Sequence, residues 1–129
     1  MEKFSISTTT RNELIDITRR VQSAVKDSGV KDGVCTVYCP HTTGAITINE
    51  SADPSVASDI ERKLKKMVPK NENYSHAEGN SDSHIKSSLV GNTVQVILDN
   101  GSLQLGTWQG IFFCEFDGPR TRNVWVKIS

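Results

Sequence analysis

The pattern of hydrophobic and polar positions predicts several short strands and two amphipathic helices. Segments that alternate between apolar and polar residues, or that are rich in β-branched residues, are typical of strands, and turn residues separate them here. The predicted strands cover residues 4–7, 34–38, 45–49, 94–98, 111–116 and 124–128. Only a short connection that begins at Pro40 separates the second strand from the third, so the pattern predicts that these two form a hairpin.

The two predicted helices each carry one apolar stripe with helical spacing. The first is predicted to end near Gly29, and the second to begin at Asp53-Pro54 and to end near Val68, because Asp caps free N–H groups and Pro suits the first helical position. The first stripe consists of Leu14, Ile17, Val21 and Val25. The predicted buried side of the second helix consists of Val56, Ile60, Leu64 and Met67.

Residues 70–83 contain almost no apolar side chains, and the pattern therefore predicts a loop there. A loop of this length in a small domain is usually functional. Residues 85–89 are predicted to form one helical turn that ends at Gly91. The order of elements predicts one α+β domain across residues 1–129, with mostly antiparallel strands in a β-sandwich-like core and two main helices.

Composition and charge exclude several classes of function. Fifteen Lys and Arg residues balance fifteen Asp and Glu residues, so the basic surface of a nucleic-acid-binding protein is missing. No apolar segment approaches the roughly 20 residues that span a bilayer, so no membrane association is expected. The three cysteines lie in apolar surroundings without CxxC spacing, which indicates reduced core residues and a cytoplasmic protein.

The three histidines are the first candidates for chemistry. His76 and His84 are the first and last residues of a polar segment of nine residues, and His41 follows a strand that is predicted to be buried. Three imidazoles with water in the fourth position form an open catalytic zinc site, in which nearby carboxylates orient the rings or act as bases. The alternative is a polar surface loop whose histidines are incidental.

Two carboxylates lie in or next to strands that are predicted to be buried. Glu50 shares a face with two isoleucines just past its strand, so it either pairs with a cation or lies beyond the buried portion, and Glu115 lies in an otherwise apolar strand. Such a carboxylate needs a cationic partner or has a raised pKa, so Glu115 is either a catalytic or ligating group or part of a structural ion pair. The turn after it carries Arg120 and Arg122, which suit bidentate binding of phosphate; an Arg–Asp pair that fixes the turn is the alternative.

Five motifs in order resemble those of the YjbQ-type family, also called the secondary thiamine-phosphate synthases. The resemblance covers essentially the whole chain. The motifs are His41-Thr42-Thr43, Asn49-Glu50 with Asp53, His76-x-x-Gly79-Asn80-x-Asp82-x-His84, Gly106-Thr107-Trp108-Gln109 and Glu115-x-Asp117-Gly118-Pro119-Arg120.

The resemblance implies a compact α+β fold that assembles as a homotrimer, with polar pockets near the subunit boundaries. It implies that His41, His76 and His84 converge on a divalent metal, for which zinc is the first choice. It also implies a weak thiamine-phosphate synthase activity, in which hydroxymethylpyrimidine diphosphate joins thiazole phosphate and pyrophosphate leaves.

The candidate residues suit such a transfer to a small phosphorylated substrate. A metal ion and Arg120 could neutralise the leaving diphosphate, and Asn80 and Gln109 could orient polar groups. Glu115 or Asp82 could move a proton or hold a histidine, and Glu50 completes the candidate set. Two alternatives stay open: a metal-dependent hydrolase of a phosphate ester or amide, and a trimeric protein that binds a small anion without turnover.

Overall fold

The computed structural model describes residues 1–129. The strands are β1 (Glu2–Ser7), β2 (Glu13–Asp16), β3 (Gly33–Tyr38), β4 (Gly44–Glu50), β5 (Thr93–Asp99), β6 (Ser102–Leu103), β7 (Gln109–Glu115) and β8 (Thr121–Ile128). The helices are α1 (Thr18–Ser28), α2 (Pro54–Met67) and α3 (Ser81–Val90). None of the three helices is both long and apolar enough to cross a membrane.

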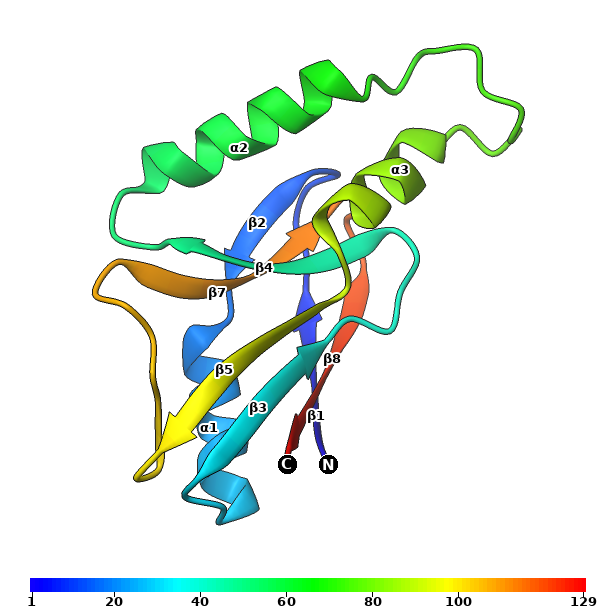
Figure 1. Cartoon of the computed structure of the whole chain (residues 1–129). Coiled ribbons are helices and arrows are strands. Elements are labelled where there is room, and N and C mark those ends of the chain that lie inside the picture. The colour runs from blue at the N-terminus through cyan, green and yellow to red at the C-terminus, as the bar shows by residue number, and fades with distance from the viewer.

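The strands form two antiparallel sheets (Figure 1). The larger sheet has the order β1-β8-β3-β5-β6, and the smaller has the order β2-β7-β4. The main core lies between the sheets and α1, where Val21 and Val25 of α1 meet Val37 of β3 and Phe113 of β7. The α+β fold with mostly antiparallel strands is therefore confirmed.

The other face of the small sheet is covered by α2 and α3. Ala45 and Cys114 point to that face and pack against Leu64 of α2 and Val90 of α3. Figure 1 shows α3 lying over β4, while the segment that joins α2 to α3 extends outward. All three cysteines are free and buried, as predicted.

The predicted hairpin of residues 34–38 and 45–49 is wrong. β3 pairs with β5 and β8 in the large sheet, whereas β4 pairs with β7 in the small one. The connection at residues 39–43 carries the chain from one sheet to the other. Both strands pair with strands that are distant in the sequence, because those pairings bury their apolar faces. A short connection along the chain therefore does not determine which strands pair.

The first helix begins later than predicted. Leu14 belongs to β2, which pairs with β7, and the helix starts at Thr18, whose N–H and hydroxyl both donate to Asp16 Oδ1. A spacing of three between Leu14 and Ile17 fits a helix only by coincidence. The predicted end is confirmed, since Gly29 adopts the left-handed conformation that ends many helices (φ 72°).

The second helix runs as predicted, from the Asp53 cap to Met67, but none of its residues is fully buried. Met67, which the stripe places on the buried side, is 58% exposed. The helix rests on the small sheet through Leu64 and through Glu61, whose carboxylate accepts a hydrogen bond from the backbone N–H of Leu14 (2.6 Å).

The predicted loop ends earlier than expected, because residues 81–90 form a third helix, α3. Its buried side is polar and consists of Ser81, Asp82, Ser83, Lys86 and Ser87. Its apolar residues Ile85 and Leu89 are exposed. The predicted helical turn of residues 85–89 that ends at Gly91 is confirmed as the last part of this helix. Hydrophobic periodicity does not find the first part, in whose first turn His84 lies.

Candidate functional site

His41 and His84 come from different elements and line one cavity of about 600 Å³. His41 lies in the connection between β3 and β4, and His84 lies in the first turn of α3. None of the residues that line this cavity is hydrophobic. The other lining residues are Thr42, Gly44, Ser87, Ser88, Gly91 and Asn92.

Backbone hydrogen bonds join the two sides of this cavity. The N–H of Cys39 donates to the carbonyl of Asn92 (2.8 Å), and the N–H of Ile46 donates to the carbonyl of Gly91 (3.1 Å). The end of α3 is thereby fixed to the connection that carries His41. We refer to this cavity as the His41–His84 cavity.

His76 faces His84 from the segment between α2 and α3. Their ring centres lie 5.5 Å apart, and the rings are nearly perpendicular. Both line a second cavity of about 330 Å³, together with Tyr74, Ser75, Ser81 and Ile85. His84 therefore belongs to both cavities and links His41 on one side to His76 on the other.

The ring of His41 is held in a defined state. Its Nε2 accepts a hydrogen bond from the backbone N–H of Asn123 (2.9 Å), and its edge packs against the ring of Phe113. Burial, with the positive charge of Arg122 nearby, lowers the pKa of His41 below its ordinary value of 6.5. A neutral imidazole whose Nε2 accepts a hydrogen bond carries its proton on Nδ1. His41 is thus a donor through Nδ1 at neutral pH.

Beneath His41 lies a buried ion pair between Glu115 and Arg122. Arg122 Nε donates to Glu115 Oε2 (2.8 Å), and its Nη2 donates to the carbonyl (3.0 Å) and hydroxyl (2.8 Å) of Thr43. Both side chains are almost completely buried. The pair therefore anchors the His41-Thr42-Thr43 segment from below.

Glu115 is ionised in this pair. Burial by itself raises the pKa of a carboxyl group, but the hydrogen bonds from Arg122 and from the N–H of Asp117, with the charge of Arg122, outweigh it and lower the pKa of Glu115. Of the two possibilities that the sequence left open, a partner or a raised pKa, the structure shows the partner. Sequence analysis did not identify Arg122 as that partner, although its place on the same strand face as Val124 and Val126 indicates an inward side chain.

Asp82 belongs to a second buried cluster. Its two carboxylate oxygens accept hydrogen bonds from Arg11 (3.0 Å each), and Lys86 Nζ lies 3.2 Å from one of them. Burial opposes ionisation, but both cations together lower the pKa of Asp82. These contacts fix the first turn of α3, on which His84 lies, against the segment before β2. Arg11 and Lys86 were not among the sequence candidates.

Asn80 and Arg120 meet at a third residue, Asp117. Asn80 Nδ2 donates to Asp117 Oδ2 (2.8 Å), and Arg120 Nη2 donates to the same oxygen (3.1 Å). The Arg–Asp pair that the sequence offered as an alternative is therefore present, while half of the Arg120 side chain stays exposed. Asn80 Oδ1 is buried without a hydrogen-bond partner, which leaves an acceptor for a ligand or a water molecule.

Glu50 and Gln109 lie at the other end of the small sheet. They are directly opposite each other in the β4–β7 pair, whereas Gly44 and Glu115 form the pair at the end near His41. At about 3.3 Å per residue, the two ends are roughly 20 Å apart. One chain therefore does not bring Glu50 and Gln109 to the histidines, and Gln109 Oε1 instead accepts a hydrogen bond from the N–H of Gly106 (2.8 Å).

The histidines of one chain do not make a complete zinc site. No group of three or more His, Cys, Asp or Glu side chains is placed to hold a metal ion together. His76 and His84 are suitably close, but Nε2 of His41 accepts the hydrogen bond from Asn123, and its other nitrogen carries the proton. A three-histidine site would require His41 to give up that hydrogen bond and reorient.

The sequence profile of the family described as UPF0047 protein YjbQ-like matches residues 2–129. The chain belongs to this family. The UPF0047 protein MJ1081 of Methanocaldococcus jannaschii is 58% identical over 126 residues, which are 98% of this chain and 91% of that protein. The UPF0047 protein YugU of Bacillus subtilis is 50% identical over 129 residues, with 99% and 98% of the two chains covered.

Solved structures of the UPF0047 family have the same fold. A crystal structure of a YjbQ/UPF0047 family protein from Clostridium acetobutylicum is 55% identical, covers both chains completely and has a TM-score of 0.97. The conserved hypothetical protein TT1486 of Thermus thermophilus is 38% identical, with complete coverage of both chains and a TM-score of 0.93. The family and its fold are thus shown, and these names state no activity.

Proposed function

We propose that this UPF0047 protein binds a small phosphorylated substrate in the His41–His84 cavity and transfers a group of the thiamine-phosphate synthase type, with low turnover. The observation that carries the proposal is the cavity itself, in which two histidines from different elements line a space without hydrophobic side chains. Such a lining suits a polar, charged substrate better than an apolar one.

The exposed half of Arg120 is the cationic group near His41 that favours an anionic substrate. Burial is the main cause of the lowered pKa of His41, and the charges of Arg122 and, less strongly, Arg120 add to it against the charge of Glu115. Arg120 could therefore contribute to neutralising a leaving diphosphate, as the motif resemblance suggests. His41 with its Nδ1 proton is suited to donate a hydrogen bond to a phosphate oxygen or to the leaving group.

Glu115 and Asp82 support this site indirectly. Both carboxylates are paired with buried cations, so we assign them the positioning of His41 and His84 rather than direct proton transfer. Asn80 could orient a polar group through its open Oδ1. Glu50 and Gln109 could contribute only from a neighbouring subunit, because they lie at the far end of the β4–β7 pair.

The test measures release of pyrophosphate from hydroxymethylpyrimidine diphosphate and thiazole phosphate by the unaltered protein, His41→Ala and His84→Ala. A control is Lys63→Ala, an exposed substitution on α2, away from both cavities that the histidines line. We expect turnover that both histidine variants lose and the control keeps. Absence of turnover in the unaltered protein, with saturable binding of either substrate, would instead favour a binding protein without turnover.

A metal-dependent hydrolase is the second candidate, and the His76–His84 pair favours it. The centres of the two rings lie 5.5 Å apart, and Glu78 Oε2 is 3.8 Å from His76 Nε2. We propose that His76 and His84 are the two main ligands of a bound zinc ion. Elemental analysis of zinc in untagged protein tests this, and we expect His76→Ala and His84→Ala to lose the bound zinc. Loss of zinc in His41→Ala as well would show that His41 is a third ligand.

We also propose that the protein is a homotrimer, as the motif resemblance suggests. In a single chain, several large apolar side chains are exposed, among them Leu89 (60%), Ile97 (65%) and Trp108 (62%). Subunit contacts would bury such residues. The mass of the protein in solution at micromolar concentration tests this, and a monomeric mass would contradict it.

A further inference from the structure

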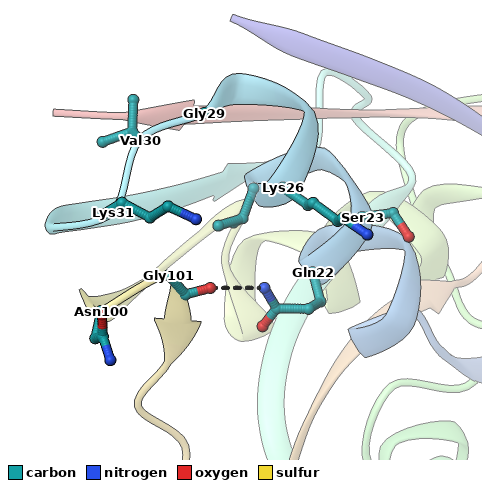
Figure 2. Close-up of a pocket in the computed structure, with 9 residues that line it drawn as sticks. Gln22, Ser23, Lys26, Gly29, Val30, Lys31, Asn100 and Gly101 are labelled. Atoms are coloured by element: carbon teal, nitrogen blue, oxygen red, sulfur yellow. Dashed lines mark hydrogen bonds between the residues drawn. The ribbon is translucent and has the colours of Figure 1, made fainter.

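A separate cavity of about 300 Å³ lies between the end of α1 and the turn that joins β5 to β6. Figure 2 shows Lys26 and Ser23 of α1 on one side, Lys31 on the segment that follows the helix, and Asn100 and Gly101 on the turn. No histidine lines it, so it is distinct from the candidate site described above.

The walls of this cavity are tied to one another. Gln22 Nε2 donates to the carbonyl of Gly101 (3.1 Å), as the dashed line in Figure 2 shows, and its Oε1 accepts from the N–H of Leu103 (3.3 Å). The N–H of Gly101 donates to the carbonyl of Lys31 (2.8 Å). The side-chain amide of Gln22 thus joins α1 to the turn between β5 and β6, and the backbone of that turn binds the segment that carries Lys31. The cavity is preformed.

The charged side chains that line the cavity are both positive. Lys26 and Lys31 line it, neither takes part in an ion pair, and no acidic side chain is among the lining residues. The nearby Asp32 carboxylate accepts a hydrogen bond from the backbone N–H of Asn100 (3.1 Å) and forms no ion pair with either lysine. Two ammonium groups that share a cavity without an acidic lining residue attract a small anion.

Gly101 lets Lys31 lie in this position. A side chain added at Gly101 would place its Cβ 3.3 Å from Lys31 Cδ and 3.5 Å from Nζ, so the ammonium group lies directly over the turn. In Figure 2 the Lys31 side chain extends from its own segment toward α1 and across Gly101. The left-handed backbone of Gly101 (φ 78°) further favours glycine at this position.

We propose that this cavity binds a small oxyanion, namely the phosphate group of a small metabolite or inorganic phosphate. Lysine ammonium groups bind phosphate as point charges, and the Ser23 hydroxyl on the same wall adds a possible donor. No aromatic residue is present on which a nucleobase could stack, and the only apolar lining residues are Val25 and Val30. The cavity therefore suits a compact phosphorylated compound and not a nucleotide.

The test is a titration of ¹⁵N-labelled full-length protein with inorganic phosphate, followed by two-dimensional NMR at constant ionic strength. We expect saturable shifts of the amide signals of Lys31 and Gly101. In the double variant K26Q/K31Q we expect at least a tenfold weaker response. The control K63Q/K66Q removes the same charge from exposed positions on α2 and should keep the response unchanged.

The outcome separates this cavity from the histidine site. His84→Ala is expected to keep the shifts of Lys31 and Gly101, whether or not the proposed transfer activity exists. Shifts that do not saturate, or that K26Q/K31Q keeps at full size, would overturn the proposal. The spectra also report directly that each variant is folded.

Discussion

The two histidines that flank His84 are held in opposite ways. His41 is fixed by a backbone N–H, by the ring of Phe113 and, through Thr43, by a buried ion pair. His76 lies on a segment of mostly exposed residues, its side chain is 43% exposed, and the carboxylate that it contacts, that of Glu78, is itself exposed. One wall of the site is therefore preorganised, whereas the other has few fixed contacts and can adapt to a ligand.

This difference between the two walls indicates that the buried carboxylates have a structural role. Glu115 and Asp82 each stabilise one element that carries a histidine, the His41 connection and the first turn of α3 respectively. No comparable pair stabilises the segment of His76. Removing each of these pairs in turn tests the contrast between the two walls.

Removing Arg122 should have the largest effect on stability. Arg122→Met leaves Glu115 buried without its partner and frees the carbonyl of Thr43, and we expect a loss of about 3–5 kcal/mol in the free energy of unfolding. Urea unfolding measures it. Arg120→Met is the matched control, because Arg120 is half exposed, and its cost should stay below about 1 kcal/mol. Equal costs for the two arginines would show that the buried pair does not anchor this wall.

Asp82→Asn should rank second. The substitution leaves the buried ammonium of Lys86 and the guanidinium of Arg11 without a counter-charge, and we expect a loss of about 3 kcal/mol. Amide hydrogen exchange should show faster exchange in α3. The control Asp59→Asn breaks an exposed pair with Arg62 on α2 and should change stability by less than about 1 kcal/mol.

The sequence predicts most of the fold, but of α3 it predicts only the last part, residues 85–89 ending at Gly91. A helix is recognised by an apolar stripe, and the stripe of α3 is replaced by polar groups that satisfy one another. Ser83, for example, donates to the carbonyl of Phe116. Only the three-dimensional partners of such residues show that they are buried.

The candidate site was predictable in part. The residue types and their order identify the histidines and Glu115 as candidates, because a carboxyl group in an otherwise apolar strand needs a cationic partner or a raised pKa. The separation of Glu50 and Gln109 from the histidines was not predictable, since it depends on the register of β4 with β7. That register depends on strand pairing between residues far apart in the sequence, which local patterns do not determine.

The pH dependence of stability should show a smaller effect, which comes from His41. Its pKa in the folded protein is below 6.5, so the unfolded chain binds a proton more readily, and stability falls as the pH drops below 6.5 and through the folded-state pKa. His41→Gln has no titrating group and should lose less stability between pH 7.5 and pH 5.0. Urea unfolding at both values measures this, and an equal loss in the two proteins would contradict the neutral state of His41.

His76→Ala should have the smallest effect. Because the side chain is partly exposed and has no short hydrogen bond, we expect the free energy of unfolding to change by less than about 0.5 kcal/mol. The same measurement on Glu78→Gln should give a similar result. A loss of more than about 2 kcal/mol for His76→Ala would mean that the two walls are held alike.

We propose that His41 and His84, which line one cavity, act together on one substrate. The most direct measurement is kcat/KM for the proposed transfer in His41→Ala, His84→Ala and the double variant. We predict a loss of about 10²-fold in each single variant and at most about tenfold more in the double variant, because residues that act as a unit are not additive. A loss of kcat/KM in the double variant that equals the product of the two single losses would contradict the claim, as would unchanged turnover in either single variant.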